Sequence, residues 1–154
     1  MAIKESTIQS QILSFLKVRR ILHNRINNGQ FFIKEQIIDK YGRKRNKNRA
    51  VRCNTLNGIP DIEVFCFISN NDKPVIPVNI YLEVKNKNGK QSYHQKLFQS
   101  RIESANGFYY VVRSVDDVVK AFKDTESRIK QTFGDDFALE FMKAFSLPEL
   151  NKKM

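Results

Sequence analysis

One stretch in the second half of the chain restricts the fold more than any other part. Val78 to Lys85 is rich in β-branched and apolar residues, which is typical of a strand. Ser92 and Gln95 have the spacing of a capping box and predict a helix start, and Gly107 suits the end of that helix. Phe108 to Val112 is a second apolar strand. Two strands joined through a helix pair in parallel by a right-handed crossover, so the sequence predicts an α/β protein.

Three further elements are expected before this unit. Apolar residues recur at helical spacing from Glu5 to Leu22 and predict a first helix. Arg25 to Ile33 has a short extended pattern, with a bulge or tight turn expected at Asn27-Asn28-Gly29. Asp61 to Ile68 is a strand, followed by turn residues at 70–74. The expected order is helix, three-strand meander, helix, strand and helix, which gives a mixed central sheet flanked by helices.

The C-terminal part of the chain is expected to be helical. A helix starts near Val115, and Gly134-Asp135 separates two helices. We expect residues 1–122 to hold the core and 123–154 to be a helical extension of the same domain. Four phenylalanines recur at helical spacing in this extension: Phe133, Phe137, Phe141 and Phe145. They suit either core packing against the sheet or an interface between two copies of the chain.

Composition narrows the class of protein. The chain has 154 residues, 41% of them hydrophobic, which fits one compact domain. Its net charge of +11 is expected of proteins that bind phosphate backbones. We expect no membrane partner, because no apolar run of about 18 residues occurs. The start of the chain lacks the apolar stretch of a signal peptide, so we expect a cytoplasmic protein. Cys53 and Cys66 do not have the spacing of a zinc site and are expected to be inert thiols.

Lysines and arginines are concentrated in the segment from Lys40 to Arg52. This segment has hardly any apolar residue and is expected to be a basic loop or arm, because it cannot form a packed element on its own. Such an arm would bind DNA by neutralising phosphates, although a solvated, disordered loop is the alternative. The candidate DNA-binding residues are Arg43, Lys44, Arg45, Lys47, Arg49 and Arg52, together with Asn27 and Asn28.

Two carboxylates and one amine are expected to meet at the end of the sheet. If the Asp61 and Val78 strands are antiparallel neighbours, Asp61 lies beside Glu83 and Lys85, which project from one face of their strand. Gly58 and Pro60 would present Asp61 at a defined strand start. Neighbouring carboxylates repel each other, and a divalent cation or a raised pKa relieves this repulsion. All-oxygen ligands favour Mg²⁺ or Mn²⁺.

A cation at this place would support phosphodiester hydrolysis. It would polarise the phosphodiester and acidify a bound water, while Lys85 would orient that water or stabilise the charge on phosphorus. The alternative is an ordinary strand with an ion pair between Glu83 and Lys85. Glu63 lies on the same strand face as Asp61 and could replace or supplement the expected ligands.

The order of the motifs resembles the VRR-NUC branch of the PD-(D/E)xK nucleases, which is related in fold to Holliday junction resolvases. The matching pieces span residues 5 to about 122 and are Glu5-Ser6-Thr7-Ile8-Gln9, Arg25-Ile26-Asn27-Asn28-Gly29, Asn57-Gly58-Ile59-Pro60-Asp61, Tyr81-Leu82-Glu83-Val84-Lys85, Gly89-Lys90-Gln91-Ser92-Tyr93-His94-Gln95 and Val112-Arg113-Ser114-Val115-Asp116-Asp117. The resemblance implies a restriction-endonuclease-like αβββαβ core with extra C-terminal helices.

The resemblance also implies a role for each site residue. Asp61, Glu83 and the Val84 carbonyl would bind the metal, Lys85 would assist the water, and Glu5 and Gln95 would complete the site from two helices. Glu5 also suits the first turn of a helix by charge alone, and Gln95 also suits a capping box. Gln95 begins a helical stripe that continues with Phe98 and Ile102, so it is expected to point inward.

The expected activity is therefore that of a Mg²⁺- or Mn²⁺-dependent DNA endonuclease. By resemblance, small members act on branched DNA such as Holliday junctions or flaps as homodimers, in the host cytoplasm if a virus encodes them. Two alternatives stay open: a noncatalytic nucleic-acid-binding module on the same fold, and a restriction-type enzyme that reads a short DNA sequence.

Overall fold

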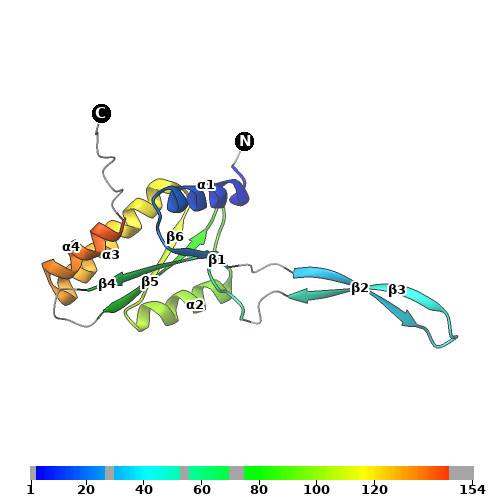
Figure 1. Ribbon diagram of the computed structural model, residues 1–154. Coiled ribbons are helices and arrows are strands. Elements are labelled where there is room, and N and C mark those ends of the chain that lie inside the picture. The colour runs from blue at the N-terminus through cyan, green and yellow to red at the C-terminus, as the bar shows by residue number, and fades with distance from the viewer. Residues whose placement is uncertain (1–2, 27–29, 53–55, 70–74, 146–154) are drawn as a thin grey trace.

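The computed structural model describes residues 3–26, 30–52, 56–69 and 75–145. Four helices and six strands occur in these ranges (Figure 1). In chain order the elements are α1 (Glu5–Val18), β1 (His23–Arg25), β2 (Gln30–Ile38), β3 (Lys44–Arg52), β4 (Ile62–Ile68), β5 (Ile76–Val84), α2 (Tyr93–Ser104), β6 (Phe108–Val112), α3 (Val115–Phe133) and α4 (Asp135–Phe145). The protein is mixed α/β, as expected.

The main sheet has four strands in the order β1-β4-β5-β6. Neighbouring strands β1, β4 and β5 are antiparallel, which confirms the meander. Strand β6 pairs in parallel with β5, with Tyr81 opposite Tyr109, which confirms the crossover through α2. The capping box at the start of α2 is also confirmed, since Ser92 and Gln95 each bind the other's backbone N–H.

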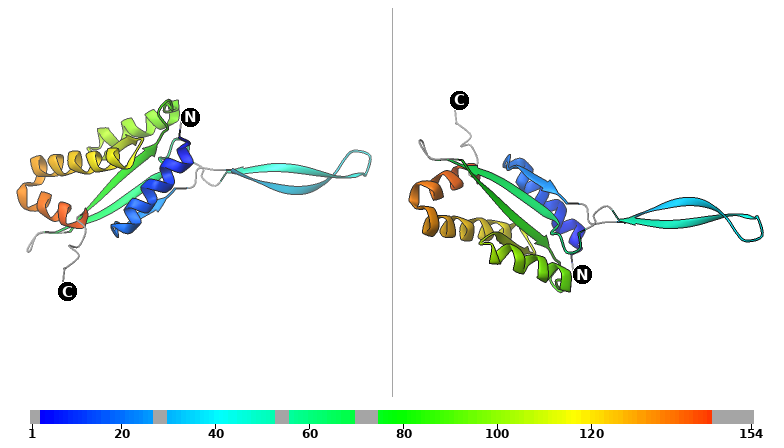
Figure 2. Two further views of the ribbon diagram at one scale, coloured as in Figure 1. Left: turned by 90° about the horizontal axis from the view of Figure 1, so that it is seen from above. Right: turned by 90° about the horizontal axis from the view of Figure 1, so that it is seen from below.

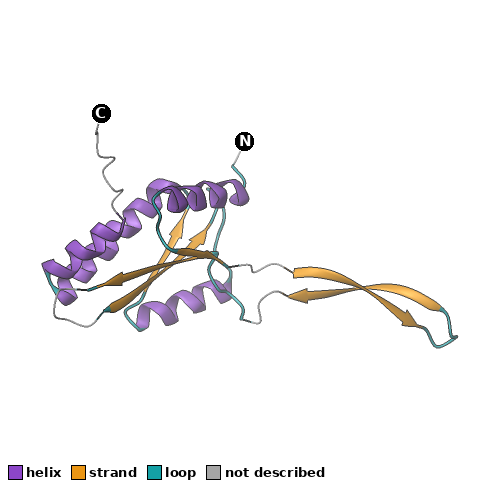
Figure 3. Cartoon of the chain, viewed as in Figure 1, coloured by secondary structure: helices purple, strands orange, loops and turns teal. Residues whose placement is uncertain are grey.

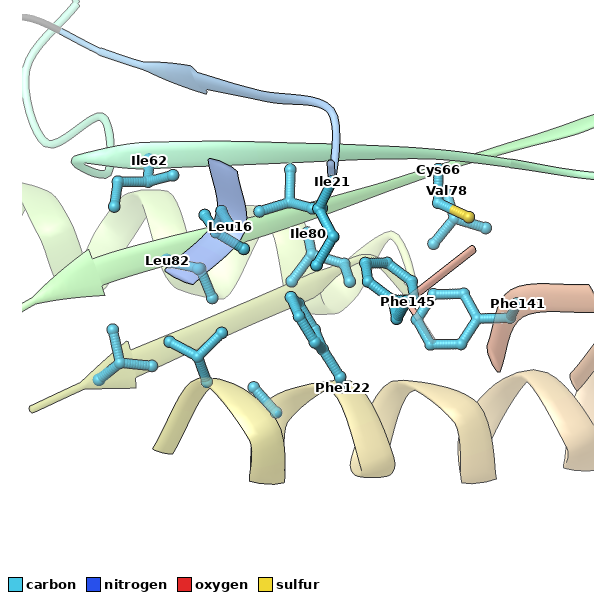
Figure 4. Packing of buried hydrophobic residues seen from close by; sticks show 14 of the residues in the cluster. Leu16, Ile21, Ile62, Cys66, Val78, Ile80, Leu82, Phe122, Phe141 and Phe145 are labelled. Carbon is cyan, nitrogen blue, oxygen red and sulfur yellow. The ribbon is translucent and has the colours of Figure 1, made fainter. Parts of the chain in front are cut away.

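Helices cover both faces of this sheet (Figure 1). On one face α1, α3 and α4 pack on residues that alternate along β4 and β5 (Figure 4). The buried residues of β4 are Ile62, Val64, Cys66 and Ile68. Helix α2 lies on the opposite face, where Phe98 packs its ring edge-on against Tyr81. The period-two alternation in the sequence therefore decides which strand residues reach the main core.

Three of the four C-terminal phenylalanines belong to the core. Phe137, Phe141 and Phe145 are buried, whereas Phe133 is 45% exposed. The rings of Phe141 and Phe145 are tilted against each other at a centroid distance of 4.4 Å, and Phe145 also contacts Phe122 of α3 (Figure 4). The break between α3 and α4 falls at Gly134, whose φ is +98°, as the sequence indicated. Helix α3 runs without interruption through residue 122, so α3 and α4 share one core with α1.

The first helix is shorter than predicted, because it ends at Val18 rather than near Leu22. Arg20 adopts a φ of +56°, and its N–H bonds the Lys17 carbonyl while the Ile21 N–H bonds the Leu16 carbonyl. This is a Schellman end, which usually has glycine at the left-handed position. Ile21 is thereby turned into the core, so its apolar character was mistaken for one more helical turn.

The basic segment Lys40–Arg52 was expected to be a loop or arm, and from Lys44 onward it is strand β3 rather than a loop. Strands β2 and β3 form a separate two-stranded antiparallel sheet that extends away from the main sheet (Figures 1 and 2). The extended stretch predicted from Arg25 to Ile33 is accordingly divided: its start belongs to β1, and Gln30 onward belongs to β2. Backbone pairing satisfies the polar groups that face between the two strands, and those on the outer edges face solvent, so the pair forms without a core and composition alone pointed to a loop.

A tight turn closes this hairpin (Figure 3). Asp39 Oδ1 accepts hydrogen bonds from the N–H groups of Tyr41 and Arg43, and Gly42 has a φ of +75°. An aspartate that binds the backbone two residues on, followed by a glycine with positive φ, is a recognised turn signal. The sequence carries this signal, but it was hidden among the surrounding cations.

Among the described residues, no helix combines the length and the apolar character needed to cross a bilayer.

Candidate active site

The pairing of β4 with β5 brings Asp61 and Glu83 together. Ile62 is opposite Leu82, so Asp61, one residue earlier, comes beside Glu83, one residue later. Asp61 Oδ2 accepts a hydrogen bond of 2.8 Å from the Val84 N–H, and the Asp61 carbonyl accepts one of 2.8 Å from Ile26. The side chain is therefore held at the strand end on which the sequence placed it.

Glu83 is the most enclosed carboxylate of the cluster, with 0% of its surface exposed. Its Oε1 accepts hydrogen bonds of 2.5 Å from Lys85 Nζ and of 2.5 Å from Gln95 Nε2. Its Oε2 lies 3.4 Å from the hydroxyl of Tyr109. Lys85 is itself buried. The structure thus brings together Asp61 and the three groups around Glu83 on the α2 side of the sheet.

Gln95 fulfils both interpretations that the sequence allowed. Its Oε1 accepts a hydrogen bond of 2.8 Å from the Ser92 N–H, which completes the capping box. Its Nε2 donates to Glu83, so the side chain points inward as the helical stripe indicated. The capping bond fixes the orientation of the amide and leaves only its N–H₂ group available for the carboxylate.

Glu5 approaches the site from the start of α1. Its Oε1 accepts a hydrogen bond of 3.3 Å from the Asn86 N–H, just beyond β5. A Cβ added to Gly89 would come within 2.7 Å of the same oxygen, so a larger residue there would displace the Glu5 carboxylate. Glu5 therefore contacts the loop that follows the strand carrying Glu83, in addition to lying in the first turn of its helix.

The segment before Asp61 is packed against the start of α2. Gly58 has a φ of +82°, as expected for the sharp strand entry, and a Cβ there would lie 2.2 Å from the His94 carbonyl oxygen. No other residue type fits that space without moving the backbone. This contact holds the loop that precedes Asp61 against the helix that carries Gln95.

Burial dominates the electrostatics of the two central carboxylates. Desolvation raises the pKa of Glu83 to about 7, with a further contribution from the negative charge of Asp61, while the hydrogen bond from Lys85 opposes the rise. Desolvation also raises the pKa of Asp61, opposed by the Val84 N–H and by Lys85, and the charge of Glu5 adds to the increase. The carboxylates are thus close enough to destabilise one another's charged forms.

The donor chemistry of the cluster suits a hard divalent cation, because all its potential ligands are oxygens. In the part of the chain that the structure describes, no three Asp, Glu, His or Cys side chains form a ready metal-binding group. The Val84 N–H points to Asp61, and in an extended strand the carbonyl of a residue points to the same side as its N–H. The Val84 carbonyl therefore faces the Asp61 side, as the expected ligand set requires.

Glu63 lies on the same sheet face as Asp61, but two residues farther along β4 and therefore farther from Glu83. It is opposite Tyr81 in the ladder and shares a hydrogen bond with the Tyr81 hydroxyl. Burial raises the pKa of Tyr81, and the charge of Glu63 raises it further. Glu63 is thus engaged beside the cluster rather than within it.

Sequence reasoning missed Tyr109, which is buried against Glu83. Burial and the neighbouring Glu83 raise the pKa of Tyr109, so its hydroxyl stays protonated and available as a donor, and Gln91 also bonds it. A signal was present, because Tyr109 and Val111 alternate with Phe108 and point to the opposite face of β6. The parallel register then places Tyr109 opposite Tyr81, next to Glu83.

The candidate DNA-binding residues lie on the hairpin, apart from the cluster. Arg43 is exposed at the turn, and strand β3 carries Lys44, Arg45, Lys47, Arg49 and Arg52. The hairpin is inserted between β1 and β4, so its two ends join the sheet near Asp61. Asn27 and Asn28, the other two candidates, lie outside the described residues.

Comparisons with protein-family models, with curated proteins and with solved structures find no match for this chain. The arrangement of the described residues is therefore the basis for the function proposed below.

Proposed function

We propose that the protein is a divalent-metal-dependent nuclease that hydrolyses phosphodiester bonds of DNA at the Asp61–Glu83 cluster. The observation that carries the proposal is the position of Asp61 beside Glu83, with Lys85 and Gln95 bound to the same Glu83 oxygen. The start of β4, the end of β5 and the start of α2 thus each contribute a polar side chain to the same place. The resemblance to the VRR-NUC branch of the PD-(D/E)xK nucleases leads to the same site.

The cost of building this cluster supports a functional role. A buried carboxylate and a buried ammonium group lose several kcal/mol each of hydration, and apolar residues of similar size often stabilise a fold equally well. Glu83 near the end of β5 and Lys85 just after it are nevertheless both buried. Strongly perturbed carboxylates gathered at one place are frequent at catalytic sites.

Asp61, Glu83 and the Val84 carbonyl would hold the cation, with Glu5 completing the set from α1. A Mg²⁺ or Mn²⁺ ion bound there supplies electrophilic stabilisation of a phosphoryl oxygen and lowers the pKa of water. Lys85 would orient the attacking water and stabilise negative charge on the phosphoryl group. Gln95 keeps Glu83 in position, because its own orientation is fixed by the capping box.

The charge distribution supports DNA as the substrate. The net charge of the chain is +11, and the hairpin carries a large part of the cations on a segment that extends from the same end of the sheet as Asp61 (Figure 1). Phosphate neutralisation would give sequence-independent affinity. By the same resemblance we propose branched DNA and a homodimer. With Phe137, Phe141 and Phe145 buried, a dimer would use another surface.

A noncatalytic nucleic-acid-binding module is the second candidate. It is favoured by the absence, within the described ranges, of three metal-binding side chains already arranged around one point. It would use the basic hairpin and leave the Glu83–Lys85 pair as a structural element.

The two candidates differ in one set of assays on the full chain. Linear duplex, nicked, flap and four-way-junction DNA are incubated with Mg²⁺, Mn²⁺ or EDTA, and thermal unfolding is recorded under the same conditions. The nuclease proposal expects cleavage only with metal, and metal-dependent stabilisation that Asp61→Asn abolishes. Binding without cleavage and without stabilisation by either metal would support the noncatalytic module.

A further inference from the structure

The hairpin formed by β2 and β3 has two faces with different chemistry. Paired residues of an antiparallel ladder share a face, and alternate residues change face. Ile38 is opposite Lys44, so all even-numbered residues of both strands lie on one side, which we term the Lys44 face. The odd-numbered residues, including Lys47 opposite Glu35, lie on the other side, which we term the Lys47 face.

Two of the three strand cations on the Lys47 face are ion-paired with carboxylates. Arg49 Nη1 lies 3.1 Å from Glu35 Oε1 and forms a hydrogen bond with it. Arg45 Nε lies 3.1 Å from Asp39 Oδ2, as an ion pair without hydrogen-bond geometry. Lys47 is the third cation on the strand positions of this face. Ion-paired side chains must first release a partner before they bind a phosphate.

The arginines of the Lys47 face also lie beside its apolar residues. Arg49 is opposite Ile33 and Arg45 is opposite Ile37. Ile33 and Ile37 are 42% and 39% exposed, whereas Phe32 and Ile38 on the Lys44 face are 63% and 69% exposed. The methylene stems of arginine can cover apolar surface while the charged group stays in water. The Lys47 face is therefore the more covered of the two.

The Lys44 face is open and carries no carboxylate on the described strand positions. Lys34 is opposite Asn48, and Gln36 is opposite Asn46, so four hydrogen-bonding side chains form a block in the middle of this face. The strand positions of this face carry three cations, Lys34, Lys44 and Arg52, and no carboxylate. Amide side chains donate and accept hydrogen bonds, and exposed Phe32 and Ile38 at the two ends can make apolar contacts.

We propose that the Lys44 face of the hairpin is the surface that binds duplex DNA, lying along the major groove. This inference rests on the DNA binding proposed above. A two-stranded ribbon fits the major groove, where asparagine and glutamine can bond base edges and apolar side chains can contact thymine methyl groups. Nine residues per strand extend about 30 Å, close to one helical turn of DNA.

Charge favours DNA over a second copy of the chain as the occupant of this face. Another copy also carries +11, so its approach to a basic hairpin is opposed by long-range repulsion. A polyanion instead gains affinity from each phosphate neutralised.

Lys44 and Lys47 provide a matched test, since both are exposed lysines of β3 and lie on opposite faces. DNA binding is measured by anisotropy with the full chain in EDTA, across a salt series, on a duplex about three helical turns long. Lys44→Gln is expected to weaken binding about 8-fold at about 0.1 M salt and to reduce the salt slope by about 1. Lys47→Gln is expected to weaken it less than about 2-fold. An equal or larger loss for Lys47→Gln would overturn the proposal.

The asparagines of β3 on the Lys44 face, Asn46 and Asn48, give a second, independent readout. Asn46→Ala with Asn48→Ala removes no charge, so it is expected to weaken duplex binding several-fold while the salt slope stays unchanged. Wild-type affinity for this double variant would contradict groove contact by the Lys44 face. If wild type binds DNA and none of these variants changes the affinity, only the hairpin inference fails. If wild type neither binds nor cleaves DNA, the proposed function fails with it.

Discussion

Gln95 Nε2 donates a hydrogen bond of 2.5 Å to Glu83 Oε1, while Gln95 Oε1 accepts one of 2.8 Å from the Ser92 N–H. One amide thus connects the start of α2 to the end of β5. Because the capping box uses the Oε1 oxygen of this amide, its Nε2 nitrogen must face the Glu83 carboxylate. A flip of the amide group would break both hydrogen bonds. Helix capping and site geometry are coupled through this single side chain.

Two substitutions separate these roles. Ser92→Ala removes the hydroxyl that accepts a hydrogen bond from the backbone N–H of Gln95. It is expected to lower the free energy of unfolding by about 1 kcal/mol, with little effect on cleavage. Gln95→Ala removes both the capping bond to Ser92 and the hydrogen bond to the buried Glu83 carboxylate. It should lower the free energy of unfolding by about 2–3 kcal/mol and reduce cleavage. Urea unfolding and a cleavage assay measure both. If the two variants reduce cleavage equally, Gln95 acts only as a capping residue.

Gly58 is expected to be far more sensitive to substitution than Gly42. Both have positive φ, but a Cβ at Gly58 would meet the His94 carbonyl at 2.2 Å, whereas one at Gly42 would meet nothing within 4 Å. Gly42→Ala therefore carries only the conformational cost, about 1 kcal/mol. Gly58→Ala should cost at least about 1 kcal/mol more, because the loop before Asp61 must move away from α2. Equal losses in urea unfolding would show that this contact does not constrain the loop.

Much of this site was predictable because it depends on local periodicity. Alternation along β5 places Glu83 and Lys85 on one face, and a capping box places Gln95 at a helix start. Tyr109 was missed because its contact with Glu83 depends on the register between β5 and β6, which no local pattern states. The Schellman end at Arg20 was missed for a related reason, since the conformation of this arginine is imposed by the burial of Ile21.

The two alternatives for the C-terminal phenylalanines predict different stabilities. Phe141 is fully buried and Phe133 is about half exposed, although both lie in the same helical extension. Phe141→Ala should lower the free energy of unfolding by about 3–5 kcal/mol, and Phe133→Ala by less than about 1 kcal/mol. Thermal and urea unfolding at several protein concentrations test this. A loss for Phe141→Ala that vanished at high concentration would point instead to an interface between copies.

Glu83 gives the stability of the metal-free protein a characteristic pH dependence. Its pKa rises from 4.5 to about 7 on folding, because the carboxyl group is buried. Between these values the folded state keeps a proton that the unfolded state has lost, so the free energy of unfolding falls as pH rises. The loss amounts to about 3 kcal/mol, from 2.5 pH units at about 1.4 kcal/mol each. Glu83→Gln in EDTA should remove this component, and an unchanged pH profile would contradict the assignment.

Composition explains why the hairpin was the least predictable part of the fold. Cations in strand β3 resemble a disordered segment, because a strand is usually recognised by the apolar residues that it buries. Here the backbones of β2 and β3 pair with each other, and the turn at Asp39 and Gly42 fixes the register. Phe32, Ile33, Ile37 and Ile38 of β2 are exposed, so no core pattern could identify the pair.

Cleavage of DNA by Asp61→Asn, with Glu63→Gln as the matched control, tests the central claim most directly. Both substitutions replace a carboxylate on the same sheet face with its amide, but only Asp61 lies beside Glu83, whereas Glu63 bonds Tyr81. With Mg²⁺ or Mn²⁺, wild type and Glu63→Gln are expected to cut at similar rates. Asp61→Asn should be slower by at least about 100-fold, and EDTA should stop all three. Cleavage by Asp61→Asn at the wild-type rate, or undiminished cleavage in EDTA, would contradict the metal-dependent nuclease.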